Sequence, residues 1–126
     1  MKISHITVSA FVMLAPSFLT AQPAKWGKSP VGAILQTPDG KTLYVFDGDH
    51  AGSGASTCTG NCAKLWPPYL ASNEAKAEGD WTLIARDDGA RQWAYRGRPV
   101  YTWVKDGPGE TSGDGMAGNR WHVAKP

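Results

Sequence analysis

The chain contains Tyr44-Val-Phe46-Asp-Gly-Asp49 and repeats the pattern as Tyr101-Thr-Trp103-Val-Lys-Asp106. Both stretches read Tyr-x-aromatic-x-x-Asp, and each follows an Asp-Gly pair. Each is also followed, after a Gly-rich stretch, by a tryptophan, Trp66 or Trp121. Features that recur in a fixed order indicate a repeated supersecondary unit. The sequence therefore predicts a domain made of two degenerate repeats.

Short strand signals separated by turn signals surround both copies of the motif. Strands are expected at residues 31–36, 41–46, 81–86, 92–95, 100–104 and 120–124. Asp39-Gly40 and Asp88-Gly89 predict tight hairpin turns, because glycine accepts the positive φ that such turns need. Short helical turns are expected at residues 63–66, which Pro67 and Pro68 end, and within residues 71–78. These signals together indicate an all-β or β-rich small domain.

Alternation along the first motif strand predicts which side chains share a face. Thr42, Tyr44 and Phe46 point to one side, and Leu43 and Val45 to the other. One hairpin alone cannot bury its apolar face in water. We therefore expect the two repeats, about residues 31–70 and 80–126, to pack as pseudo-symmetric halves.

Residues 1–21 have the composition of a secretory signal peptide. Lys2 supplies a positive charge, the following run is mostly apolar with no acidic residue, and Ala21 offers a small residue at the cut. Cleavage after Ala24 and an uncleaved amphipathic anchor are the alternatives. No cysteine lies near the cut to accept a lipid, so we expect a soluble periplasmic or secreted bacterial protein.

About 105 residues remain after cleavage, which suits one domain. Residues 22–30 are expected to form a Pro-punctuated lead-in with Trp26 as an anchor, and residues 31–126 a single β-rich domain. The formal net charge of the whole chain is only +2, and its Lys and Arg residues are scattered. This charge pattern excludes the basic surface typical of a nucleic-acid-binding protein. The sequence also lacks the basic amphipathic helix that is typical of membrane-surface binding.

Cys58 and Cys62 are expected to form a disulfide, because an exported protein meets an oxidising compartment. Copper is the first alternative: thiolates with three residues between them can hold Cu(I) together with His50, His122 or Met116. Thiol redox exchange is the second alternative, although the thioredoxin-like βαβ context is missing. With a disulfide, we expect no cofactor.

The pattern allows two interpretations of Asp49 and Asp106. As a functional pair they would be cation ligands or an acid/base pair. The favoured reading is structural: each carboxylate accepts backbone N–H bonds in the turn after its strand, with a tyrosine packed beside it. The loop after Asp106 could also place Asp106, Glu110 and Asp114 around calcium, but its spacing is not that of an EF-hand.

Aromatic residues are numerous for a chain of this size, and most are expected in the core. Trp93 with Tyr95, and Tyr101 with Trp103, share faces of neighbouring predicted strands. Exposed, they would form a platform for a sugar ring or another planar ligand; buried, they are cross-strand core pairs, which is the expectation here. The predicted structural aromatics are Trp66, Trp93, Tyr95 and Trp121.

The order of motifs resembles a family of bacterial secreted repeats that includes lipoproteins and carries the Tyr-x-aromatic-x-x-Asp signature. The resemblance rests on the two motif copies and on Cys58-Thr-Gly-Asn-Cys62-Ala-x-x-Trp66-Pro-Pro, Gln92-Trp-Ala-Tyr95-x-Gly-x-Pro99-x-Tyr101, Pro108-Gly-x-x-x-Gly-Asp-Gly115 and Trp121-His-Val-Ala124. It covers nearly all of the chain after the leader. The family has no assigned activity, so the resemblance implies architecture and export and no reaction. The lipid-acceptor cysteine of the lipoprotein members is missing here.

We expect a non-enzymatic binding or interaction module in the periplasm, with a small ligand or an envelope protein as its partner. A copper-handling or thiol redox protein is the alternative from a different class, and a structural cell-envelope protein is the second alternative. The serines lack the Gly-x-Ser-x-Gly frame of a nucleophile elbow, which argues against a hydrolase.

Overall fold

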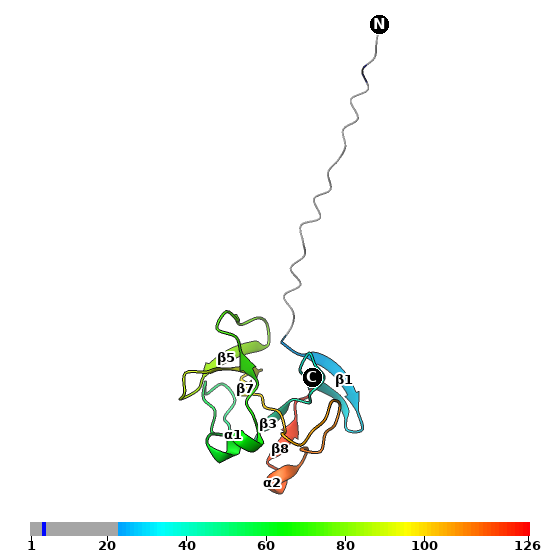
Figure 1. The fold of residues 1–126 in the computed structure, drawn as a ribbon, viewed down its shortest axis with the longest axis vertical. Coiled ribbons are helices and arrows are strands. Elements are labelled where there is room, and N and C mark those ends of the chain that lie inside the picture. Colours follow the sequence, from blue (N-terminus) through cyan, green and yellow to red (C-terminus); the bar gives the residue numbers. More distant parts are fainter. Residues whose placement is uncertain (1–3, 5–22) are drawn as a thin grey trace.

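A computed structural model describes residue 4 and residues 23–126. The signal peptide predicted at residues 1–21 lies outside the described residues, apart from Ser4. The described chain is β-rich, as predicted, with eight short strands and two helices of one turn each (Figure 1). In chain order they are β1 (Lys25–Ser29), β2 (Gly32–Gln36), β3 (Tyr44–Phe46), α1 (Asn61–Leu65), β4 (Leu70–Ala71), β5 (Trp81–Ala85), β6 (Arg91–Tyr95), β7 (Arg98–Pro99), α2 (Met116–Asn119) and β8 (Trp121–Val123).

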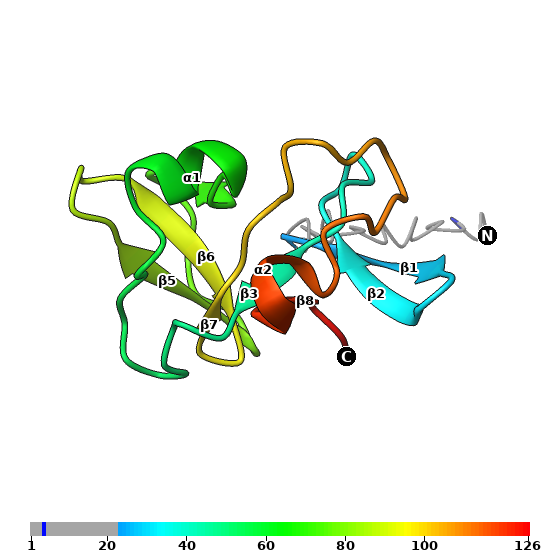
Figure 2. The same ribbon diagram turned by 90° about the horizontal axis from the view of Figure 1, so that it is seen from below.

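All strand pairs are antiparallel and fall into three small sheets. β1 pairs with β2 in the first repeat, and β4, β6 and β5 lie side by side with β7 on the edge of β6 in the second half of the chain. β3 and β8 pair with each other between these two sheets (Figure 2). The centre of the molecule is therefore built from one strand of each repeat.

The two repeats exchange their central strands. Tyr44 in β3 lies opposite Val123 in β8, so a strand of the first repeat is completed by the end of the second. In return, the second motif bonds to the first repeat, where Thr102 N–H donates to the Pro67 carbonyl at 2.9 Å and Val104 N–H to that of Leu65 at 3.0 Å. The β3–β8 sheet therefore needs one strand from each repeat.

The pseudo-symmetry centres on the two motif tyrosines. Tyr44 N–H donates to the Tyr101 carbonyl at 2.8 Å, and Tyr101 N–H donates to the Tyr44 carbonyl at 2.9 Å. The flanking backbone repeats the same plan: Leu43 N–H bonds to Leu35, as Val100 N–H bonds to Trp93. The prediction of two pseudo-symmetric halves is confirmed.

Cutting the segment that connects the repeats tests this exchange. A protease site placed within residues 72–77, which are exposed apart from Ala75, should yield two fragments that still elute together on gel filtration. They should separate only in denaturant, because each fragment completes the sheet of the other. Fragments that elute separately under native conditions would contradict the exchange.

Strand alternation sends side chains into two separate buried clusters. Tyr44 and Phe46 contribute to one cluster, and Leu43 and Val45 to the other, as the period of two predicts. The first cluster holds Ile34, Tyr44, Cys58, Trp66, Tyr101, Trp103, Trp121 and Val123, and the second holds Leu35, Leu43, Trp81, Tyr95, Val100 and Ala124. Both faces of the central strands are therefore buried.

Residues 25–29 correct the prediction of a lead-in over residues 22–30, because they form β1. Lys25–Ser29 alternates too weakly to read as a strand alone. The strand exists because Pro30 and Val31 turn the chain back onto β2, and Ser29 Oγ secures that turn by donating to the Gly32 carbonyl at 2.9 Å. Tertiary pairing thus overrides a poor local signal.

Three other expectations also need correction. Residues 71–78 form no helix, since β4 and turns occupy them. The hairpin over residues 31–46 is closed only as far as the Gln36–Thr42 bridge, after which β3 turns to β8. Residues 100–104 contribute isolated bridges at Tyr101 in place of a full strand. Within the described residues, no helix has the length and apolar content to cross a membrane.

Candidate functional site

The motif tyrosines and aspartates form two reciprocal pairs across the repeats. Tyr44 of the first repeat donates its hydroxyl to Asp106 Oδ2 of the second. Tyr101 of the second repeat donates its hydroxyl to Asp49 Oδ2 of the first, at 2.6 Å. Each aspartate lies beside a tyrosine, as the motif predicts, but the tyrosine belongs to the other copy of the motif.

The second carboxylate oxygen of each aspartate holds the loop that follows it. Asp49 Oδ1 accepts the Thr57 N–H at 2.7 Å and the Thr57 hydroxyl at 2.8 Å. Asp106 Oδ1 accepts the Ser112 N–H at 3.0 Å and also the Ser112 hydroxyl. Each aspartate therefore joins its own loop to the tyrosine of the opposite repeat.

Four aromatic rings stack through the centre of the molecule with the same symmetry. Trp66 and Trp121 lie face to face, with ring centroids 3.8 Å apart and planes 2° apart. Phe46 covers Trp121 at 4.4 Å, and Trp103 covers Trp66 at 4.4 Å. Phe46 thus stacks on a tryptophan of the other repeat, and Trp103 packs on one with its plane tilted by 33°. These ring contacts hold the two halves together.

Burial and hydrogen bonding keep the motif tyrosines protonated. Burial, and next the hydrogen bond to Asp106, raises the pKa of Tyr44 far above its usual 10.0. Burial and the bond to Asp49 raise the pKa of Tyr101 in the same way. A phenol with such a pKa does not act as a base near neutral pH. The motif side chains are thus engaged in holding the fold.

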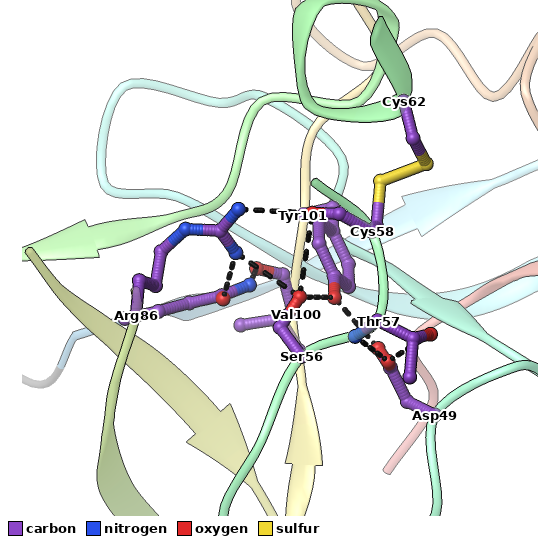
Figure 3. The surroundings of a disulfide bond; sticks show 9 residues. Asp49, Ser56, Thr57, Cys58, Cys62, Arg86, Val100 and Tyr101 are labelled. Carbon is purple, nitrogen blue, oxygen red and sulfur yellow. Dashed lines mark hydrogen bonds between the residues drawn. A yellow bond between two sulfur atoms is a disulfide. The ribbon is translucent and has the colours of Figure 1, made fainter. Parts of the chain in front are cut away.

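A polar chain that joins Arg86 of the second repeat to Ser56 of the first departs from the symmetry. Arg86, directly after β5, donates Nη1–H to Gln92 Oε1 at 2.7 Å and to Ser56 Oγ at 3.0 Å, and Nη2–H to the Cys58 carbonyl at 2.9 Å (Figure 3). Ser56 Oγ lies 2.5 Å from the Tyr101 hydroxyl, so the chain continues to Asp49.

The equivalent place in the first repeat is apolar. Leu35 and Trp93 make matching backbone bonds, so Ile34 corresponds to Gln92, and both are fully buried. Gln92 Nε2–H donates to the Val100 carbonyl at 2.9 Å, which satisfies this buried amide. The sequence pattern did not indicate this set of contacts, because Ser56 lies 30 positions before Arg86 in the chain.

The structure joins Cys58 and Cys62 as a disulfide with their Cα atoms 5.2 Å apart. Cys58 is fully buried, and its carbonyl accepts from Arg86 (Figure 3). The corresponding place in the second repeat is Gly113, where an added Cβ would lie 2.7 Å from Trp66. The two loops therefore meet the aromatic stack differently, one through a bridged cysteine and one through a glycine.

An open groove lies on the side of the second buried cluster, between the two repeats. Its volume is about 330 Å³, and its lining residues are Trp26, Leu35, Glu78, Gly79, Asp80, Trp81 and Tyr95. Trp26 comes from β1 of the first repeat, whereas Trp81 and Tyr95 come from β5 and β6 of the second. A hollow of about 470 Å³ also borders Glu78 and contains Trp93, but its other lining residues come from Pro23 and the 72–77 segment.

Trp26 is the exposed ring of this groove. Its side chain is 53 % exposed, whereas Trp81 and Tyr95 are buried at 6 % and 7 %. Arg96 lies at the rim: its Nε is 3.4 Å from Asp80 Oδ2, and its guanidinium carbon is 5.2 Å from the centre of the Tyr95 ring. The groove thus combines aromatic walls with charged rim groups.

A family model described as a secreted repeat of unknown function matches residues 25–69 and again residues 82–125. The chain belongs to this family of secreted repeats. Both matched segments begin at equivalent edge strands, β1 and β5, so β1 is part of the repeat unit. No match was found among curated proteins or solved structures.

The metal candidates of this secreted repeat are not gathered in one place. The described residues contain no group of three or more His, Cys, Asp or Glu side chains placed to hold a metal ion. His122 Nε2 lies 2.9 Å from Asp47 Oδ2, His50 is exposed, and Met116 is 39 % exposed. With its sulfur atoms bonded to each other, the cysteine pair presents no thiolates.

The carboxylates considered for calcium bond to backbone amides. Glu110 Oε1 accepts the Gly107 N–H at 2.9 Å, and Asp114 Oδ1 accepts the Val123 N–H at 3.1 Å. Asp106 bonds to Ser112 and Tyr44. These contacts shape the loop of residues 106–115 and fasten its end to β8.

The aromatic residues considered for a platform divide between the two clusters. Tyr101 and Trp103 lie in the first cluster, next to Trp66 and Trp121. Tyr95 lies in the second cluster, and Trp93 packs against it half-buried. The four do not form one exposed face, and the accessible ring belongs to Trp26.

Removing the disulfide should lower stability and leave the strands in place. The bridge closes a short loop, so we expect the Cys58→Ala/Cys62→Ala variant to lose about 2 kcal/mol of unfolding free energy in urea. Far-UV circular dichroism should be unchanged, since Asp49 still holds Thr57 in the same loop. A structural role for the bridge would be contradicted if the double variant were as stable as the parent protein and if dithiothreitol did not lower the stability of the parent protein.

Stability should fall in alkali because of the motif tyrosines. Their pKa values are raised in the folded state, so the folded chain keeps protons that the unfolded chain releases above pH 10. The stabilisation is therefore complete below pH 10 and declines above it, by up to about 1.4 kcal/mol per pH unit for each tyrosine.

Urea unfolding at pH 8 to 11.5 measures this effect, with absorbance at 295 nm reporting tyrosinate. The Tyr44→Phe/Tyr101→Phe variant should show a shallower decline, although Tyr69, whose pKa burial also raises, leaves part of it. Tyrosinate from all four tyrosines near pH 10 in the folded protein would contradict the prediction.

Proposed function

We propose that this secreted repeat is a non-enzymatic binding module of the cell envelope, exported by its predicted leader, with the groove at Trp26 as its binding site. The observation that carries the proposal is the exposure of Trp26. It is the one tryptophan of the described residues that is more than half exposed. Large aromatic side chains left in contact with water beside a hollow mark recognition surfaces more often than they mark stability.

The position of the groove supports a binding role. Both repeats contribute walls to it, and the stack of Trp66 and Trp121 fixes the two halves relative to each other. A site built on rigid elements loses little conformational freedom when a ligand enters. The motif tyrosines and aspartates serve this rigidity, since their bonds join one half to the other.

The test is a nuclear magnetic resonance titration of the mature protein with a small panel: a neutral disaccharide, a basic tripeptide and an acidic tripeptide. At least one member should shift the Trp26 indole N–H signal saturably, and Trp26→Ala should abolish the accompanying shifts in β1 and the 78–80 segment. Trp93→Phe, in the neighbouring hollow, is the matched control and should leave them unchanged. A panel that shifts only signals outside the groove would overturn the proposal.

A further inference from the structure

The chemistry of the groove indicates the class of ligand that it takes. Its lining includes two carboxylates, Glu78 and Asp80, and the aromatic rings of Trp26, Trp81 and Tyr95. The described residues that line it include no Lys, Arg or His. Carboxylates attract a cation at the rim, and aromatic faces stabilise the same cation through their quadrupoles.

Arg96 shows that a guanidinium fits these groups. Its side chain lies over the Tyr95 ring at 5.2 Å and pairs with Asp80 at 3.4 Å, so one cation uses both an aromatic face and a carboxylate of the lining. The backbone of Arg96 is held independently, because its N–H donates to the Asp80 carbonyl at 2.8 Å. The side-chain contact is therefore an addition to a turn that is already fixed.

The pair at the rim is also easy to displace. The side chains of Arg96 and Asp80 are 58 % and 57 % exposed. Exposed pairs of this kind contribute little to stability and are screened by salt. A second guanidinium can thus replace Arg96 on Asp80 while it gains the exposed ring of Trp26, which Arg96 is not seen to contact.

We propose that the groove binds an arginine side chain of a partner polypeptide, an inference that rests on the proposed function. The planar guanidinium stacks on aromatic rings and pairs with carboxylates in a way that a lysine ammonium does not. The charge of the lining is complementary to this cation. Trp26 supplies the stacking face, and Asp80 supplies the carboxylate. The Arg96 side chain of the protein itself competes with the partner's arginine for Asp80.

Competition by Arg96 predicts that its removal strengthens binding, a result that a purely structural role for Arg96 would not give. The mature protein is titrated with acetyl-Gly-Arg-Gly-amide while the Trp26 and Trp81 indole N–H signals are followed. Arg96→Ala should bind the peptide about threefold or more tighter, because it frees Asp80 and the Tyr95 ring. Asp80→Asn and Trp26→Ala should bind it about fivefold or more weaker, and Asp47→Asn, another exposed carboxylate, should bind it as the parent does.

The ligand has a matched control as well. Citrulline has nearly the shape of arginine without its charge, so acetyl-Gly-citrulline-Gly-amide should bind about tenfold or more weaker. Raising sodium chloride from 20 to 500 mM should weaken the arginine peptide only. Equal binding of the two peptides, or no effect of Asp80→Asn, would overturn the arginine assignment.

The same titration separates the two proposals. A neutral disaccharide that shifts Trp26 saturably, where the arginine peptide does not, overturns the cationic ligand and leaves the binding groove in place. No shift at Trp26 from any probe overturns both.

Discussion

Replacing Trp121 by alanine should lower the free energy of unfolding by about 4 kcal/mol. Trp121 is 2 % exposed and touches three other rings: it stacks on Phe46 and Trp66 and meets Tyr101 edge-on. The substitution leaves a cavity at the point where the two repeats meet. Urea unfolding followed by circular dichroism measures the loss.

Two further variants make the measurement specific. Trp121→Phe keeps part of the stack and should fold with a loss of about 2 kcal/mol in the free energy of unfolding. This variant still measures the contribution of the stack if the alanine variant does not fold. Trp26→Ala is the matched control outside the core and should change stability by less than about 0.5 kcal/mol. Similar losses for Trp26 and Trp121 would show that the stack is not the centre of the fold.

Asp49→Ala should be the next most damaging change, with a loss of about 3 kcal/mol in the free energy of unfolding. Asp49 is 5 % exposed, and the substitution removes the charged acceptor of the Tyr101 hydroxyl and of Thr57. Hydrogen bonds to a charged group contribute more than neutral ones, and a buried hydroxyl that loses its partner is costly. Asp106→Ala, at the half-buried equivalent place, should lose less, about 2 kcal/mol.

A double-mutant cycle decides which tyrosine each aspartate serves. Asp49→Ala combined with Tyr101→Phe should show a coupling of about 1.5 kcal/mol, because the two side chains are bonded across the repeats. Asp49→Ala combined with Tyr44→Phe, within one repeat, should be additive within about 0.5 kcal/mol. The opposite result would place the pairs inside each repeat and refute the exchange.

The sequence predicts a tyrosine beside each aspartate but does not determine which of the two tyrosines each aspartate contacts. The spacing of Tyr44 and Asp49 is the same in both copies of the motif, so it is equally compatible with pairing within a repeat and between repeats. The choice depends on where the chain goes after β3. Because β3 joins β8 and does not continue its hairpin, each tyrosine meets the aspartate of the other copy.

The site illustrates the same limit. Trp26 stands in a segment with a weak strand signal, and its neighbours Asp80 and Tyr95 belong to the other repeat. No spacing rule links residues 26, 80 and 95, so the groove could not be found from the pattern. Arg86 and Ser56 were missed for the same reason, since 30 positions separate them in the chain.

The sequence by itself determined the two repeats, the β-rich class and the family, together with the alternation that sends Tyr44 and Leu43 to opposite faces. These features depend on local chemistry: the period of a strand, the turn preference of Asp-Gly, and motif order. The tertiary structure alone decided the exchange of strands, the replacement of Ile34 by a buried Gln92 with its Arg86 partner, and the groove at Trp26. The strand exchange and the groove join residues far apart in the chain, and the Gln92–Arg86 pair depends on burial against the other repeat. In all three, burial and satisfied hydrogen bonds in the packed molecule select the partner, and local preference does not.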